Sequence, residues 1–303
     1  MESAEDERSE ESAQRPARFA RTRQLAEALE KRGRLLNERA EPERSRHKSV
    51  DAVFELVDRD SNVGGGLIAG ALAYRLFILL LPLALVLVAG LGITADAIDR
   101  SPRSAADAAG LAGLISSSVA SAANSSARWY ALIIGLFGTV WAARSFYRAV
   151  IVSHRLVWID VREAAPKPTV LASLTFLGLL LCFEALFPVA NFIRDKSPGL
   201  GILVSLVLAL PFAGIWLLIA LRLPHRNAPW TALVPGALLM GVGAQVLHGV
   251  TQYFIVPLAL EKQGTYGALG LAAALLLGLF FLGRLIVGSA ELNAILWERR
   301  GTA

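Results

Sequence analysis

Six long stretches with few or no charged residues follow a charged N-terminal segment in this 303-residue chain. A helix needs roughly 20 apolar residues to cross a bilayer, and only helices or closed barrels satisfy every backbone polar group there. Two of the stretches, 197–221 and 227–260, carry no charge, and the other four carry one or two each. We therefore predict an all-α, multi-pass membrane protein with six transmembrane helices at about residues 64–94, 129–152, 169–190, 199–221, 229–256 and 266–296.

The composition agrees with this class, because 54% of the residues are apolar and only 18% are charged, against about 45–50% and about 25% in soluble domains. The charges gather at the start of the chain. We predict that residues 1–46 form a charged, disordered tail, which cannot act as a signal peptide. Residues 47–63 repeat apolar side chains at helical spacing and predict an amphipathic interfacial helix before the first span.

The basic residues predict the orientation, because Lys and Arg are retained on the cytoplasmic side. With the N-terminus inside, 22 of the 30 Lys and Arg residues are cytoplasmic and 6 lie outside. We expect cytoplasmic N- and C-termini, a short cytoplasmic end at 298–303, and an outer loop at 96–128. The second span is the weakest, since Arg144 and Arg148 must snorkel to headgroups, and an interfacial helix is its alternative.

Small residues recur four positions apart in several spans, for example at Gly66 and Gly70 and at Gly270, Ala274 and Gly278. Such spacing lets helix backbones approach closely in lipid. It predicts a compact bundle, and a homo-oligomer interface is another use of the same faces.

Ionisable residues within the spans are the best candidates for a functional site, because a charge at membrane depth is costly and faces protein or water. Arg75 and Arg284 are expected at similar depths of the first and last spans. Two interpretations stay open: the arginines pair between helices with acidic side chains or backbone carbonyls, or they line a polar cavity for an anion. The candidate polar site comprises Arg75, Arg284, Glu184, Glu291, Gln245 and His248.

The sequence offers no pattern for catalysis or for a cofactor. The four His residues have no metal-ligand spacing, the single Cys182 lies in an apolar run, and no nucleophile elbow is present. Gly64, Gly65 and Gly66 have neither the preceding strand nor the following Lys of a phosphate-binding loop. We therefore predict no enzyme, no catalytic or metal site, no cofactor and no nucleic-acid partner.

Several segments together resemble the YihY/virulence factor BrkB family, over about residues 45–297. They are Ala71–Phe77 with Pro82, Trp141–Arg148, Trp230–Gly236, Tyr266–Gly270 and Gly288–Asn293. The resemblance implies a six-span bacterial inner-membrane protein. It supplies no catalytic residues to transfer, and nothing here is similar to the nuclease site that an old ribonuclease BN label would need.

Two features favour transport or export of an anionic lipid or solute of the envelope. One is the pair of arginines expected at similar depth, and the other is the set of spans that are rich in glycine and kinked by proline. A structural or scaffold protein of the envelope is the alternative hypothesis. The bilayer is the expected partner in both cases.

Overall fold

The computed structural model describes residues 48–97, 128–158, 167–196, 201–255, 257 and 268–301. Within these ranges every regular element is a helix, which confirms the all-α prediction. The helices are α2 (Lys48–Val63), α3 (Gly65–Ala97), α6 (Arg128–Trp158), α7 (Val170–Lys196), α8 (Gly201–Ala220), α9 (Trp230–Val250), the π-helix η2 (Thr251–Ile255) and α11 (Ala268–Gly301). The predicted tail 1–46 and most of the predicted loop 96–128 lie outside the described residues.

The chain forms two compact units, residues 1–57 and 58–303, and the second contains all helices from α3 to α11. Gly64 separates α2 from α3 in a left-handed conformation, with φ +73°, that favours glycine. Its N–H donates to the carbonyl of Ser61. This turn places the last residues of α2 beside the first residues of α3.

Five of the helical segments in the described part are long and apolar enough to cross a membrane. They are Gly65–Leu87, Trp129–Trp158, Val170–Phe187, Trp230–Ile255 and Ala272–Arg300. The fourth predicted span corresponds to α8, whose apolar stretch is the shorter Ser205–Ala220. Five span-capable helices are thus found, and the sixth span stays a prediction.

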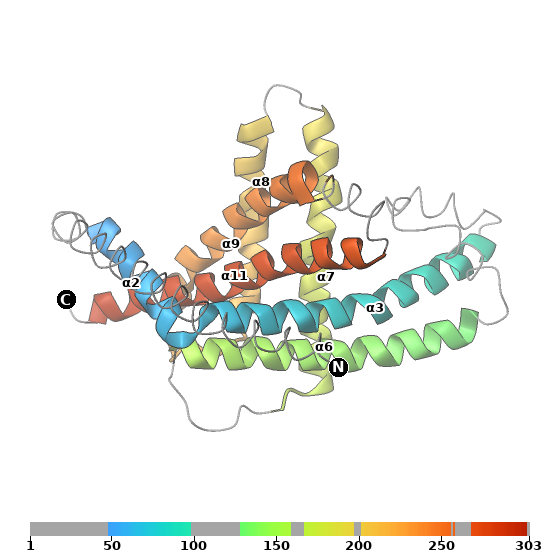
Figure 1. The fold of residues 1–303 in the computed structure, drawn as a ribbon, viewed down its shortest axis with the longest axis horizontal. Coiled ribbons are helices and arrows are strands. Elements are labelled where there is room, and N and C mark those ends of the chain that lie inside the picture. The colour runs from blue at the N-terminus through green and yellow to red at the C-terminus, as the bar shows by residue number, and fades with distance from the viewer. Residues whose placement is uncertain are drawn as a thin grey trace, which may run out of the picture. The chain divides into compact units, whose positions relative to one another are not determined.

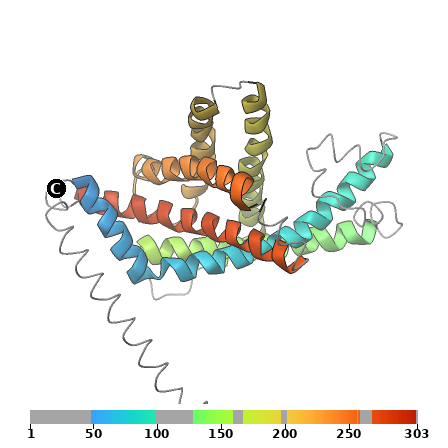
Figure 2. The same cartoon turned by 45° about the horizontal axis from the view of Figure 1, so that its top comes forward.

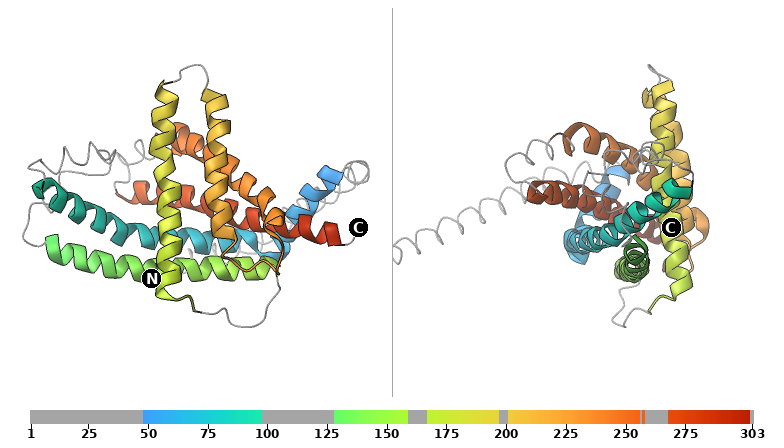
Figure 3. Two further views of the ribbon diagram at one scale, coloured as in Figure 1. Left: turned by 180° about the vertical axis from the view of Figure 1, so that it is seen from behind. Right: turned by 90° about the vertical axis from the view of Figure 1, so that its right-hand side faces the viewer.

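The helices run in two main directions. α3 and α6 lie antiparallel and side by side with the most extensive contact in the molecule, and α11 packs along α3 (Figures 1 and 2). α7 and α8 cross these three helices steeply, as the front and side views both show (Figures 1 and 3). α9 packs against α8 and α11 and joins the two groups.

The core is apolar and is shared by all of these helices. Leu72, Phe146, Phe212 and Met240 are at most 1% exposed and come from α3, α6, α8 and α9. Aromatic rings connect the two helix directions, with the centroids of Phe183 on α7 and Phe212 on α8 4.8 Å apart in an edge-to-face arrangement.

Glycine permits three close helix crossings. A Cβ on Gly283 would stand 2.6 Å from the Ala69 carbonyl oxygen, so α11 approaches α3 at backbone distance. Corresponding distances are 2.2 Å from Gly236 to the Ser289 carbonyl oxygen and 2.3 Å from Gly241 to that of Ala209. These are the close small-residue contacts expected where no hydrophobic force drives helix association.

Candidate functional site

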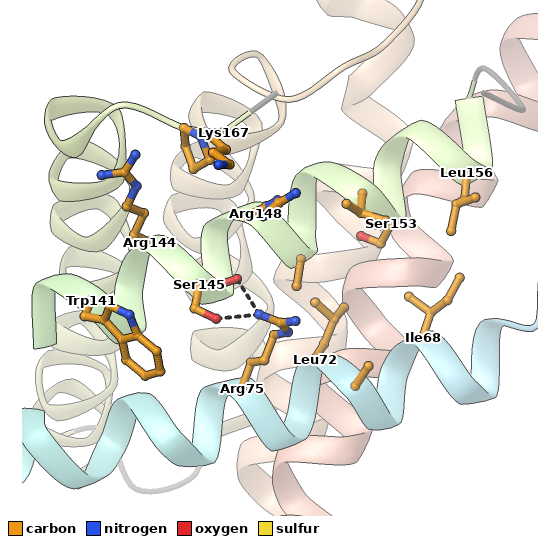
Figure 4. Close-up of a pocket in the computed structure, with 14 residues that line it drawn as sticks. Ile68, Leu72, Arg75, Trp141, Arg144, Ser145, Arg148, Ser153, Leu156 and Lys167 are labelled. Atoms are coloured by element: carbon orange, nitrogen blue, oxygen red, sulfur yellow. Dashed lines mark hydrogen bonds between the residues drawn. The ribbon is translucent and has the colours of Figure 1, made fainter. Parts of the chain in front are cut away.

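Arg75 projects from α3 toward α6, where its guanidinium meets one residue twice. Nη1 donates a hydrogen bond to the Ser145 carbonyl oxygen at 3.2 Å and a second to the Ser145 hydroxyl (Figure 4). The backbone carbonyl and the hydroxyl of Ser145 are both neutral acceptors. They hold the guanidinium in place without bringing a negative charge to it. Arg75 is therefore oriented, while no ion pair with a described residue compensates its positive charge.

A cavity of about 820 Å³ opens around this contact. One face of α3 lines it at helical spacing with Ile68, Leu72 and Arg75, and the facing stripe of α6 runs from Trp141 to Leu156. The segment just before α7 closes the cavity with Lys167 and Pro168. The site thus arises where two helical stripes, each at i, i+3, i+4 spacing, meet across the α3–α6 contact.

The cavity has a basic part and an apolar part. Arg75, Arg144, Arg148 and Lys167 occupy one part, whereas Ile68, Leu72 and Leu156 lie at the other (Figure 4). Among the described residues, no carboxylate lines the cavity. Within the described ranges, no ion pair engages any of these four cations. Such a chamber suits a ligand with an anionic group and an apolar portion.

Arg284, the second predicted arginine, lies elsewhere. Its Nη1 and Nη2 donate to the two carboxylate oxygens of Asp60, at 2.6 and 3.0 Å. Arg59, the residue before Asp60 on α2, binds the carboxylate of Glu298 at 2.7 and 3.1 Å and the Val157 carbonyl at 2.7 Å. The direct partner of Arg284 is thus Asp60, and this cluster ties the end of α2 to α6 and α11.

Glu291 follows Arg284 by two turns on α11 and is only 1% exposed. Its Oε1 has no hydrogen-bond partner within the described part of the chain. Arg284, Asp60 and Arg59 act on it electrostatically. Glu291 therefore belongs with the Asp60–Arg284 cluster and is separate from the basic cavity.

The remaining candidates lie around α7 and α9. Glu184 and His248 line a cleft of about 310 Å³ together with residues of α11. The His248 ring stacks on Phe187 with centroids 4.9 Å apart. Gln245 lies half-buried on α9, three residues before His248. Five of the six candidates consequently fall into three places, which are the basic cavity, the Asp60 cluster and the α7–α9 cleft, while Gln245 is not among the residues that line the cleft.

Three of the four cations that line the cavity were not among the candidates: Arg144, Arg148 and Lys167. The sequence pattern had assigned the two arginines to headgroup contact at the end of the second span. The signal that could have found them is the stripe Trp141, Arg144, Arg148, Val152, since its spacing puts both arginines on one helix face. No group of His, Cys, Asp and Glu suited to a metal ion is found among the described residues.

The exterior of the described helices is strongly apolar, with Leu67, Phe137 and Tyr253 each more than 75% exposed. Water does not tolerate so large an apolar surface, and lipid does. A helical chain with five span-capable segments and an apolar exterior is an integral, multi-pass membrane protein.

Within that class, the chain belongs to the virulence factor BrkB family, whose model matches residues 57–303. This confirms the resemblance seen in the sequence. Comparison with curated proteins and with solved structures gives no match in either case.

Proposed function

We propose that this protein carries an anionic lipid or solute of the bacterial envelope across the cytoplasmic membrane. In this proposal Arg75, Arg144, Arg148 and Lys167 hold the anionic group. The observation that carries the proposal is the gathering of these four cations in one cavity, whose described lining contains no carboxylate.

The electrostatics favour an anion as ligand. A cation at membrane depth costs about 3 kcal/mol or more on insertion scales, so several of them without countercharges demand compensation. Guanidinium groups match phosphate and carboxylate geometry through paired N–H donors. The volume of about 820 Å³ lies within the usual range of ligand sites, roughly 300–1,000 Å³.

The lining residues favour binding over catalysis. The Ser145 hydroxyl accepts from Arg75, and the Ser153 hydroxyl donates to the Val150 carbonyl at 2.8 Å. Neither hydroxyl has an imidazole or a carboxylate of the lining as a general base. We accordingly assign the cavity no enzymatic role.

The proposal includes the orientation with cytoplasmic termini. α3 then leaves the cytoplasmic side at Gly65, and Arg75 lies ten residues further, roughly 15 Å into the membrane at 1.5 Å per residue. An anion held there has travelled about halfway through the hydrocarbon layer, which is ~30 Å thick.

The test is flux through proteoliposomes that contain the purified full-length protein. One arm measures transbilayer movement of a fluorescent phosphatidic acid by dithionite quenching, and a second measures efflux of inorganic phosphate. The protein should accelerate one of the two, and Arg144→Gln/Arg148→Gln should abolish that acceleration while Arg300→Gln keeps it. If neither anion moves faster than in empty liposomes, the transport proposal fails and the envelope scaffold becomes the better account.

A further inference from the structure

Glu184 stands between two cavities on the other side of the α3–α6 pair from the basic cavity. Its outer neighbour is the open cleft of about 310 Å³ that it shares with His248. Its inner neighbour is a small enclosed cavity of about 10 Å³. Leu76 and Phe146 line the enclosed cavity, while the adjacent Arg75 and Ser145 face the basic cavity.

The enclosed cavity is apolar apart from Glu184. Its other lining residues are Leu76, Phe146, Phe176, Leu180, Phe183, Trp216, Ile219, Met240, Leu282 and Ile286. The one polar group among these side chains, the Trp216 indole N–H, already donates to the Ser289 hydroxyl at 3.2 Å. The wall of this cavity therefore offers the Glu184 side chain apolar contacts and no hydrogen-bond partner.

The open cleft supplies one further titratable group. The helices around it contribute Phe183 and Phe187 from α7, Ala244, Leu247 and His248 from α9, Thr251 and Ile255 from η2, and Ala274, Leu275, Gly278, Leu279 and Leu282 from α11. Among these described lining residues, His248 carries the one ionisable side chain besides Glu184. No cation of the described residues forms an ion pair with Glu184.

The local backbone holds the two groups on the same cleft. Phe187 follows Glu184 by three residues on α7, so the stacked ring of His248 lies over the helix face that carries the carboxyl. Directly after His248, α9 changes into the π-helix η2 at Thr251. Single π-helical turns inside α-helices are frequent at functional sites.

A proton fits this site better than a metal ion does. Sodium or calcium would need several oxygen ligands to replace their water. Within the described lining of the cleft, side-chain oxygens come only from Glu184 and Thr251. A proton needs only one carboxyl group, and Glu184 offers one on an open cleft.

We propose that Glu184, beside His248, is a proton-binding site that opens to the α7–α9 cleft. The carboxyl takes up a proton from the cleft and returns it there. A role in driving the anion at Arg75 rests on the transport function proposed above, whereas proton binding does not.

The experiment uses dicyclohexylcarbodiimide, which reacts with protonated carboxyl groups in apolar surroundings. Full-length protein in nanodiscs is treated between about pH 5 and about pH 9, and modified peptides are identified by mass spectrometry. Labelling of the Glu184 peptide should be strong at low pH and should fall about tenfold per pH unit above its midpoint, because only the protonated form reacts.

Three variants sharpen the result. Glu184→Gln should abolish this label, while Glu298→Gln, which removes a carboxylate bound to Arg59, should leave it unchanged. His248→Ala should move the midpoint to higher pH, because the one lining group that can become cationic is lost. Absence of label on Glu184, or labelling that does not vary with pH, overturns the proposal, as does loss of the label on adding sodium at constant pH.

Anion flux is measured in parallel in Glu184→Gln, so that the two proposals are separated. Labelling at Glu184 with no anion flux in the parent protein removes only the transport function. Flux in the parent together with no pH-dependent labelling removes only the proton site.

Discussion

The guanidinium of Arg284 binds the carboxylate of Asp60 with two hydrogen bonds, at 2.6 and 3.0 Å, across 224 positions of the chain. This bidentate pair fixes the last turn of α2 against the middle of α11. Of the two arginines predicted at membrane depth, Arg75 lines the basic cavity and Arg284 does not. The arginine that pairs with Asp60 and the arginine that lines the basic cavity are therefore different residues.

Asp60→Asn should lower the stability of the protein. The pair is partly exposed, so its loss should cost about 1–3 kcal/mol, at the level of a charge-assisted hydrogen bond. Thermal unfolding in detergent measures the effect, with Arg300→Gln as a control for removal of an exposed charge. Asp60→Asn/Arg284→Gln should be no less stable than Asp60→Asn, because the second change removes an arginine that has already lost its partner.

Gly65→Ala should have a similar effect for a steric reason. A Cβ at Gly65 would lie 1.9 Å from Oδ1 of Asp60, so the carboxylate must leave Arg284. The matched control is Gly66→Ala, where nothing lies within 4 Å of the new methyl group. We expect the control to be neutral or stabilising by about 0.5–1 kcal/mol, since alanine is the better helix former. Equal unfolding temperatures for the two variants would argue against the Asp60 contact.

Gly283→Ala should separate α11 from α3. Its Cβ would stand 2.6 Å from the Ala69 carbonyl oxygen, and backbone cannot move aside as a side chain does. Overpacking of this kind costs about 1–3 kcal/mol. Gly288→Ala on the same helix meets nothing within 4 Å and should unfold at or above the parent temperature. A Gly283→Ala protein as stable as Gly288→Ala would refute the close crossing.

An alkaline phosphatase fused after Ala303 should be inactive, because the proposed orientation puts the C-terminus in the cytoplasm, where the reporter does not fold. A green fluorescent protein at the same position should fluoresce. An active phosphatase at this site would reverse the proposed orientation and with it the direction in which the cavity faces.

The helical character and most helix positions could be predicted from charge-poor stretches alone. The second span is an example: its uncharged part is short, yet α6 runs unbroken from Arg128 to Trp158. Helical backbone hydrogen bonds are local, so periodicity and hydropathy report on them. The steep crossing of α7 over α3 and α6 depends on side-chain fit between distant segments and left no such signal.

The candidate site could be predicted only in part for the same reason. Depth alone selected Arg75 and Arg284, but the partner of Arg284 comes from the segment before the first span. Lys167 reaches the cavity from a connection that the hydropathy pattern treats as mere loop. Small-residue spacing also does not separate glycines at close helix contacts from glycines on open helix faces. A Cβ on Gly66 or Gly70 would have no neighbour within 4 Å. A Cβ on Gly236 or Gly283, which the spacing did not single out, would overlap the backbone of another helix.

Binding of a short-chain phosphatidic acid to the purified protein tests the central claim most directly. By isothermal titration calorimetry, dioctanoyl phosphatidic acid should bind the parent more tightly than dioctanoyl phosphatidylcholine. Each of Arg144→Gln and Arg148→Gln should weaken it about tenfold, which corresponds to one charge-assisted hydrogen bond of ~1.4 kcal/mol. Inorganic phosphate in place of the lipid distinguishes a free anion as ligand. If both lipids bind equally and phosphate does not bind, or if the arginine variants match Arg300→Gln, the cavity is not an anion site.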